Sequence, residues 1–266
     1  MKLAISGKGG VGKSTVAGTL ARLYAADHRR VLAVDADPDA NLASALGLPL
    51  WLRTQIHTIS TERKLIEERT GAKVREFGQM FKLNPDVSDI AQKYAIRHEG
   101  VDLLVLGAVE HAAGGCACPE SVLLKALVTH LVLREGDVVI LDMEAGIEHL
   151  GRGTAMGVDL MMTVVEPGQR SLETAERVRK MSSDLGIDSF GVVLNKTTDP
   201  EEDSRWIAGE FGPDHLLGTI PFDARIARAD RQGLALPDMG YPELLTSFRD
   251  LQKNLQSYCT EKEKVL

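Results

Sequence analysis

Cysteine is scarce in this chain of 266 residues, and its three cysteines are too few and too unevenly placed for a disulfide framework. No apolar run approaches the roughly 20 residues that a membrane-spanning helix needs. The first residues lead directly into a glycine-rich loop and lack the apolar region and cleavage site of a secretory signal. These absences exclude a disulfide-stapled scaffold and an integral membrane protein, and we expect a cytoplasmic protein.

An excess of positive charge is also missing. The 38 acidic residues outnumber the 31 lysines and arginines, which leaves a net charge of -7 at pH 7. Proteins that bind phosphate backbones or anionic lipid need basic surfaces. We therefore expect neither nucleic acid nor a membrane as a partner. Hydrophobic residues at 44% and charged residues at 26% are ordinary for globular proteins.

Short aliphatic runs without polar alternation recur along the chain, and such runs are typical of buried parallel strands. Between them, residues 14–24 and 172–185 have helical periodicity, and a helix is also expected over residues 242–257. The pattern predicts an α/β fold with a doubly wound, mostly parallel sheet flanked by helices. Residues 51–100 break the rhythm and are interpreted as an insertion in a single domain of residues 1–266. The predicted strands cover residues 3–5, 31–34, 103–106, 138–141, 160–165 and 191–194.

A glycine-rich loop of sequence GKGGVGKST occupies residues 7–15, directly after the first predicted strand. The backbone N–H groups of such a loop, and the positive end of the helix that follows, bind phosphate. We expect Lys13 to reach the β- and γ-phosphates of ATP and Ser14 to offer its hydroxyl to Mg²⁺. The sequence thus predicts an ATP-hydrolysing enzyme whose loop contacts the nucleotide through Gly9, Gly10, Val11, Gly12, Lys13, Ser14 and Thr15.

Carboxylates follow two of the predicted strands. Asp142 ends the hydrophobic strand of residues 138–141, as a Walker B element requires for Mg²⁺. Asp35 begins the acidic stretch of residues 35–39, which resembles switch I of the deviant Walker A ATPases, and this resemblance implies that Asp35 supports the same metal shell. Glu144 lies two residues beyond Asp142, which is too far for the usual Walker B base, so a polar supporting role is expected for it.

Cys116 and Cys118 form a C-x-C pair. Residues i and i+2 of an extended segment point the same way, so both thiolates can converge on one soft metal ion. Two buried structural thiols are the alternative. Thiolates also bind Zn²⁺ tightly, and the sequence alone does not select the metal. Cys259, far along the chain, is interpreted as structural.

Lys8 stands one residue into the glycine loop, and with it the loop resembles the deviant Walker A ATPases, which include nitrogenase iron protein and the septum-site and partition ATPases. The resemblance implies that two ATP-bound subunits face each other and that Lys8 crosses to the partner's phosphates. It also implies that Asp37 positions the attacking water. By the same resemblance Asn195 and Lys196 read the adenine, and Pro221 and Phe222 close over it, although Phe222 fits a core role equally well.

A narrower resemblance rests on residues 142–154, the C-x-C pair and residues 165–167, 195–196 and 220–222. Together they resemble the nickel-insertion accessory ATPases of carbon monoxide dehydrogenase, the CooC type, over nearly the whole chain except residues 51–100. The resemblance implies a homodimer bridged by nucleotide and metal. It would bind Ni²⁺, or Zn²⁺ in its place, through Cys116 and Cys118 and help to mature the nickel–iron–sulfur cluster of carbon monoxide dehydrogenase.

Two other functions are compatible with the glycine loop. A partition or cell-division ATPase would need a basic surface or tail, and the chain supplies neither. An electron-donating ATPase like nitrogenase iron protein would hold an iron–sulfur cluster, and four thiolates from two chains fit that as well. The sequence does not name the client enzyme, and an acetyl-CoA synthase is an alternative to the dehydrogenase. His111 and His149 lie near these elements but are not expected to be metal ligands.

Overall fold

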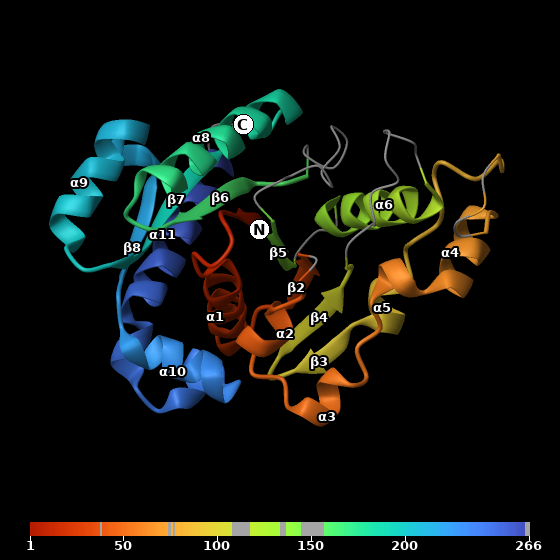
Figure 1. Cartoon of the computed structure of the whole chain (residues 1–266), viewed down its shortest axis with the longest axis horizontal. Helices are drawn as coiled ribbons and strands as arrows, with labels where there is room; N and C mark the ends of the chain where they lie inside the picture. The colour runs from red at the N-terminus through yellow and green to blue at the C-terminus, as the bar shows by residue number, and fades with distance from the viewer. Residues whose placement is uncertain are drawn as a thin grey trace.

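The computed structural model describes residues 1–37, 39–73, 76, 78–107, 118–133, 137–144 and 157–263. The strands in these ranges form one eight-stranded sheet in the order β3-β4-β2-β5-β1-β6-β7-β8 (Figure 1). Neighbouring strands are parallel except for β3 and β4, which pair antiparallel at one edge. The strands are β1 (Lys2–Ser6), β2 (Val31–Ala36), β3 (Ile96–His98), β4 (Val101–Val105), β5 (Val138–Met143), β6 (Leu160–Val165), β7 (Phe190–Thr197) and β8 (Leu216–Pro221).

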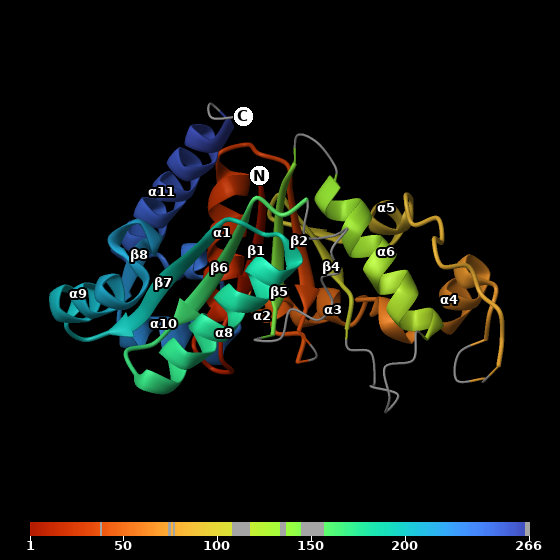
Figure 2. The ribbon, with the colours of Figure 1, turned by 90° about the horizontal axis from the view of Figure 1, so that it is seen from above.

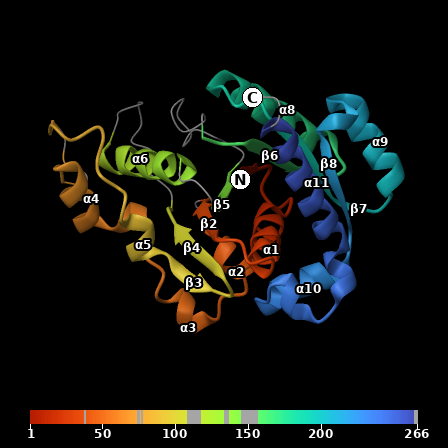
Figure 3. The ribbon, with the colours of Figure 1, turned by 180° about the vertical axis from the view of Figure 1, so that it is seen from behind.

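Helices cover both faces of the sheet, as the views from above and from behind illustrate (Figures 2 and 3). One hydrophobic core joins the sheet to α1 (Lys13–Ala26), α2 (Leu42–Ala45), α10 (Ala224–Gln232) and α11 (Thr246–Glu263). The opposite core joins it to α4 (Arg63–Thr70), α5 (Ile90–Tyr94), α6 (Pro119–Leu133), α8 (Gln169–Leu185) and α9 (Pro200–Phe211). This three-layer arrangement confirms the predicted fold class.

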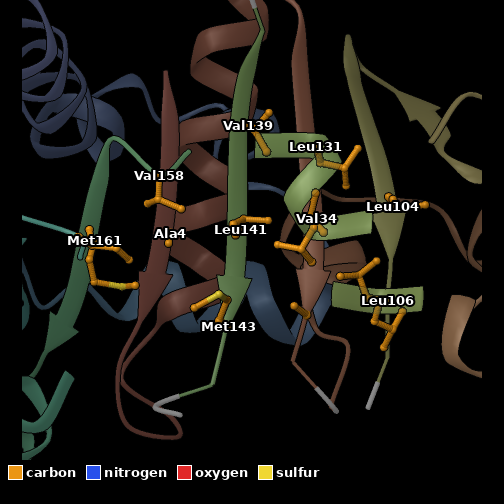
Figure 4. Packing of buried hydrophobic residues seen from close by; sticks show 14 of the residues in the cluster. Ala4, Val34, Leu104, Leu106, Leu131, Val139, Leu141, Met143, Val158 and Met161 are labelled. Carbon is orange, nitrogen blue, oxygen red and sulfur yellow. The ribbon is translucent and has the colours of Figure 1, made fainter. Parts of the chain in front are cut away.

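Burial on both faces explains the aliphatic runs of the strands. Along β5, Val139, Leu141 and Met143 face the core beneath α6 and α8, and the intervening Val138 and Ile140 face the core beneath α1 (Figure 4). Each fully buried aliphatic side chain contributes roughly 1.5–3 kcal/mol of transfer free energy. A strand whose every side chain enters a core cannot alternate with polar residues, which is why the sequence shows continuous runs.

The six predicted strands are present, and the structure adds two that were not predicted, β3 and β8. The predicted insertion at residues 51–100 contains α3 (Leu50–Arg53) at its boundary, the 3-10 turn η1 (Ile59–Thr61), α4, α5 and β3, and it lies beside β4 at one edge of the molecule (Figure 1). A tight turn joins β3 to β4 and places Glu99 and Gly100 at φ values of 46° and 80°, as a two-residue hairpin requires. The expected helix at residues 242–257 begins as a 3-10 turn, Pro242–Leu245, and continues as α11.

The strand order creates a topological switch point beside β1, in the middle of the sheet. The chain proceeds from β1 outward through β2 and β4, returns to place β5 between β2 and β1, and then continues on the other side with β6. Open α/β sheets bind ligands at the carboxyl ends of the strands at such a point. In the part of the chain described here, no helix is long and apolar enough to cross a membrane.

Candidate nucleotide-binding site

The glycine loop leaves β1 and enters α1 through Gly12, and two of its glycines admit no side chain. A Cβ on Gly7 would lie 2.4 Å from the carbonyl oxygen of Val164, and a Cβ on Gly12 would lie 2.4 Å from the side-chain amide nitrogen of Asn195. Both glycines also have positive φ, 147° and 96°. In contrast, a Cβ on Gly9 or Gly10 meets nothing within 4 Å. The loop is therefore packed against the sheet on one side and open on the other.

A cleft of about 420 Å³ adjoins this open side, a size within the range of about 300–1,000 Å³ common for ligand pockets. It brings together the loop after β1 and the ends of β2, β7 and β8, which are remote in sequence. Phe222 stands at the cleft with 57% of its surface exposed. It is thus not a core residue. The predicted residues that line the cleft are Gly9, Gly10, Gly12, Lys13, Ser14, Thr15, Asp37, Asn195, Lys196, Pro221 and Phe222.

Lys13 and Asp37 form an ion pair at the floor of the cleft. The Lys13 Nζ lies 3.6 Å from the Asp37 Oδ2, and both side chains are nearly buried. The other oxygen of Asp37 accepts a hydrogen bond from the Asp39 N–H at 3.0 Å, so that Asp39 has a local turn-forming contact. A phosphate that enters the cleft would offer Lys13 a second acceptor beside Asp37.

Two buried carboxylates lie beneath the loop, on register-paired residues of adjacent strands, Asp35 of β2 and Asp142 of β5. Asp35 accepts hydrogen bonds from the N–H groups of Leu42 at 2.9 Å and Asp37 at 3.2 Å. Burial nevertheless raises the pKa of Asp35 to about 6. Burial also raises the pKa of Asp142 to about 7, against the opposing effect of the nearby Ser14 hydroxyl. Among the described residues no donor, the nearby Ser14 hydroxyl included, has the distance and angle of a hydrogen bond to either oxygen of Asp142.

An unpartnered carboxylate inside a protein is costly. A divalent cation would satisfy it, because Mg²⁺ takes carboxylate, hydroxyl and water oxygens as ligands. The donor set of Asp142 and Ser14, with Asp35 behind it, therefore fits Mg²⁺.

Comparisons with known proteins agree with this geometry. The CobQ/CobB/MinD/ParA nucleotide binding domain family, CbiA, matches residues 2–236. The chain belongs to this family. It is 46% identical over 239 residues to the carbon monoxide dehydrogenase accessory protein CooC of Rhodospirillum rubrum, covering 90% of each chain. An ATP-binding protein of Methanocaldococcus jannaschii is 44% identical over 88% of this chain and 90% of its own.

Solved structures of MinD and ParA proteins share the fold. The MinC:MinD cell division complex of Aquifex aeolicus matches with a TM-score of 0.68 at 18% identity, over 97% of this chain and 96% of that chain. A ParA family ATPase of Chlorobium tepidum matches with a TM-score of 0.66 at 20% identity, over 95% and 98% of the two chains. The chain is thus a CooC-like ATPase of the MinD/ParA family, and ATP is its nucleotide.

Some cleft residues of this MinD/ParA-type ATPase were not predicted. They come from α2 and the turn before it, from α10 and its N-cap, and from α11. Asp223 accepts a hydrogen bond from the Arg225 N–H at 2.8 Å and caps α10. Only the strand-end residues carried a sequence signal, because the approach of α2 to α10 depends on tertiary packing. The added lining residues are Asp39, Asn41, Ser44, Ala45, Asp223, Ile226, Ala227, Asp230 and Phe248.

Asn195 and Lys196, the predicted adenine readers, contact the glycine loop itself. The Asn195 Nδ2 donates to the Val11 carbonyl oxygen at 2.7 Å, and the Lys196 Nζ donates to the Gly10 carbonyl oxygen at 2.6 Å. Lys8, in the same loop, is exposed. Glu144 is exposed too, and its carbonyl oxygen accepts a hydrogen bond from the Ser6 hydroxyl at 2.7 Å.

Of the predicted metal pair, Cys118 is described and Cys116 lies outside the described residues, as do His111 and His149. Cys118 precedes α6, and its sulfur accepts a hydrogen bond from the Ser121 N–H at 3.4 Å. Partial burial raises the pKa of the Cys118 thiol, with a smaller contribution from the neighbouring Glu120. Within the described ranges no three His, Cys, Asp or Glu side chains cluster as metal ligands. Cys259 lies in α11, but the structure describes only its backbone.

Proposed function

We propose that the chain is a dimeric, ATP-driven metallochaperone that carries nickel to carbon monoxide dehydrogenase. The observation that carries the proposal is the 46% identity, over 90% of both chains, to a carbon monoxide dehydrogenase accessory protein. The C-x-C pair supports it, because it gives this chain thiolates suited to a soft metal cargo. We also infer a single ATPase domain that acts in the cytoplasm.

Lys13 and Asp37 have complementary roles in the proposed hydrolysis. Without nucleotide they neutralise each other across 3.6 Å. When ATP binds, the Lys13 amine is attracted to the β- and γ-phosphates, and the Asp37 carboxylate becomes available to accept a proton from the attacking water. Asp37 is held at the cleft by its hydrogen bond from the Asp39 N–H, so it needs no large movement.

Ser14, Asp35 and Asp142 would hold Mg²⁺ or its bound waters beneath the phosphates. The ion would neutralise charge that develops on the phosphate oxygens. The role of Asp35 is indirect, because its two oxygens already accept backbone hydrogen bonds. Asp142, whose oxygens have no partner among the described residues, is the better direct or water-mediated ligand.

Lys8 and the C-x-C pair would each act between the two subunits of the proposed dimer. Lys8 is an exposed charge on the phosphate loop, free to reach a facing subunit and stabilise transition-state charge there. A C-x-C supplies two thiolates per chain, whereas a closed tetrahedral thiolate site takes four. Two copies across a twofold axis supply that number. ATP and metal would then favour the same dimer.

The experiment is to measure nickel in carbon monoxide dehydrogenase matured in the presence of the parent chain, of Lys13→Ala and of Cys118→Ser. The proposal predicts nickel insertion with the parent and insertion no better than without the chaperone for either variant. Equal nickel content with and without the parent chain would refute the proposal. A brown anaerobic protein with iron and labile sulfide would instead favour an electron-donating ATPase that holds an iron–sulfur cluster.

A further inference from the structure

The end of β7 contains a bulge at Lys196. Asn195 pairs with Ile220 and Thr197 pairs with Pro221 on β8, so Lys196 is the extra residue between two consecutive pairs. Its φ is 59°, in the left-handed region that costs a residue with a side chain roughly 1–2 kcal/mol. Bulges next to active sites commonly redirect a side chain. The strained backbone of Lys196 therefore indicates that the direction of its side chain matters, and the contacts of that side chain show why.

Lys196 reaches the same loop as its neighbour. In a regular strand consecutive side chains point to opposite faces, yet Asn195 and Lys196 donate to the consecutive carbonyl oxygens of Val11 and Gly10, at 2.7 Å and 2.6 Å. The bulge makes this double contact possible. The two contacts span 184 and 186 residues of sequence and tie the phosphate loop to the end of β7.

Glu166 fixes the Lys196 amine from the other side. It follows β6, and its Oε1 lies 2.5 Å from the Lys196 Nζ. The Glu166 N–H is in turn oriented by the Ser171 hydroxyl at 3.3 Å, at the start of α8. Both side chains of the pair are about two-fifths exposed, and exposed ion pairs add little to global stability. The Lys196–Glu166 pair thus contributes little to the stability of the fold, and its effect is to orient the Lys196 amine.

We propose that Lys196 is a positioning residue for the phosphate loop and not a direct ligand of the nucleotide, with Glu166 holding it in place. The inference rests on the proposed ATP site. In a trans peptide the C=O of one residue and the N–H of the next point in opposite directions. Fixing the carbonyls of Gly10 and Val11 against β7 therefore turns the following N–H groups away from β7. Gly10 and Gly12, both at positive φ, are otherwise conformationally free.

The loop is consequently ordered before phosphate arrives, which lowers the entropic cost of binding. Loss of the Lys196 amine should then weaken the binding of a ligand more, the more phosphate groups the ligand carries. Lys196→Met keeps the length of the side chain and removes the donor, and Lys196→Gly removes both the donor and the backbone strain. Lys196→Arg restores a donor, and Glu166→Gln removes the anchoring charge without touching the bulge.

The test is competition binding of ATP, ADP, AMP and adenosine to the parent and these four variants, combined with steady-state kinetics. Lys196→Met and Lys196→Gly should each weaken ATP and ADP roughly tenfold and leave adenosine unchanged. Their KM for ATP should rise with kcat within about twofold, as for a loss of uniform binding. Lys196→Arg should recover most of the affinity, and Glu166→Gln should lose part of it.

Three outcomes would overturn the inference. They are unchanged ATP affinity in Lys196→Met, an equal loss for adenosine, and tighter ATP binding in Glu166→Gln, since a direct ligand freed from its carboxylate would bind phosphate better. If Lys196→Met fails to fold, Glu166→Gln and its adenosine control decide the question alone. A parent protein that binds no ATP would refute the proposed function instead, so the two failures are distinguishable.

Discussion

Replacing Asp142 by asparagine should stabilise the nucleotide-free protein while it destroys the magnesium site. Asp142 is buried at the end of β5, its oxygens have no hydrogen-bond partner among the described residues, and burial raises its pKa from 3.8 to about 7. A carboxyl group whose pKa is higher in the folded state than in the unfolded state lowers the stability of the protein as the pH rises. Above pH 7 that loss is roughly 4 kcal/mol for this carboxylate.

The asparagine amide is uncharged, but it is also left without partners, at a cost of about 1–3 kcal/mol. Near pH 5 the carboxyl is already ionised in the unfolded chain but protonated in the folded one, which costs the parent roughly 1.5–2 kcal/mol, so the variant should match the parent there. At pH 8 it should be more stable by roughly 1–3 kcal/mol. Mg²⁺ with ATP should then stabilise the parent more than the variant, because the glycine loop and Lys13 remain in both but only the parent keeps the carboxylate.

Urea unfolding in the presence of EDTA, at pH 5 and pH 8, measures the effect. Asp214→Asn is a matched control, since Asp214 is exposed on the 3-10 turn before β8 and should show no difference at either pH. An Asp142→Asn protein that is less stable than the parent at pH 8 would refute the reasoning. That result would mean that the carboxylate has a stabilising partner in the folded chain.

Three further substitutions test the nucleotide site. Lys13→Ala should lower ATP turnover at least about 100-fold with the circular dichroism spectrum retained, and turnover at the parental rate would contradict the site. Lys8→Ala should leave ATP affinity within about threefold, because the loop N–H groups and Lys13 remain. Light scattering should nevertheless show less ATP-dependent dimer for this variant than for the parent. Equal dimer fractions would exclude action of Lys8 across the interface. Asp37→Asn should keep ATP bound and slow hydrolysis by about 100-fold, and an unchanged rate would assign the water-positioning role to another acid.

The central strands and the glycine loop could be predicted because their signals are local. Each of the six predicted strands is a continuous aliphatic run that enters both cores, and GKGGVGKST needs only one strand and one helix to place it. The other two strands carry weaker signals. β3 has only three residues, none fully buried, and β8 contains Gly218 and Thr219 within a partly exposed run.

Contacts within the site were less predictable, because they join segments far apart in the chain. Asn195 and Lys196 were predicted from family resemblance as adenine readers, yet their side chains hold the carbonyls of Val11 and Gly10. A bulge decides where Lys196 points, and no sequence pattern marks it. The roles assigned to the acids, to Lys8 and to the C-x-C pair stay predictions, and Cys116 lies outside the described residues.

Equilibrium dialysis against Ni²⁺ under reducing conditions tests the metallochaperone proposal most directly. The parent should bind one nickel per dimer, and Cys116→Ser and Cys118→Ser should each lose that binding, since two chains must supply four thiolates. Affinity for nickel should change with bound nucleotide, and by reciprocity nickel should change ATP affinity or dimerisation by the same factor. One nickel per monomer, or full binding without either thiol, would contradict the account.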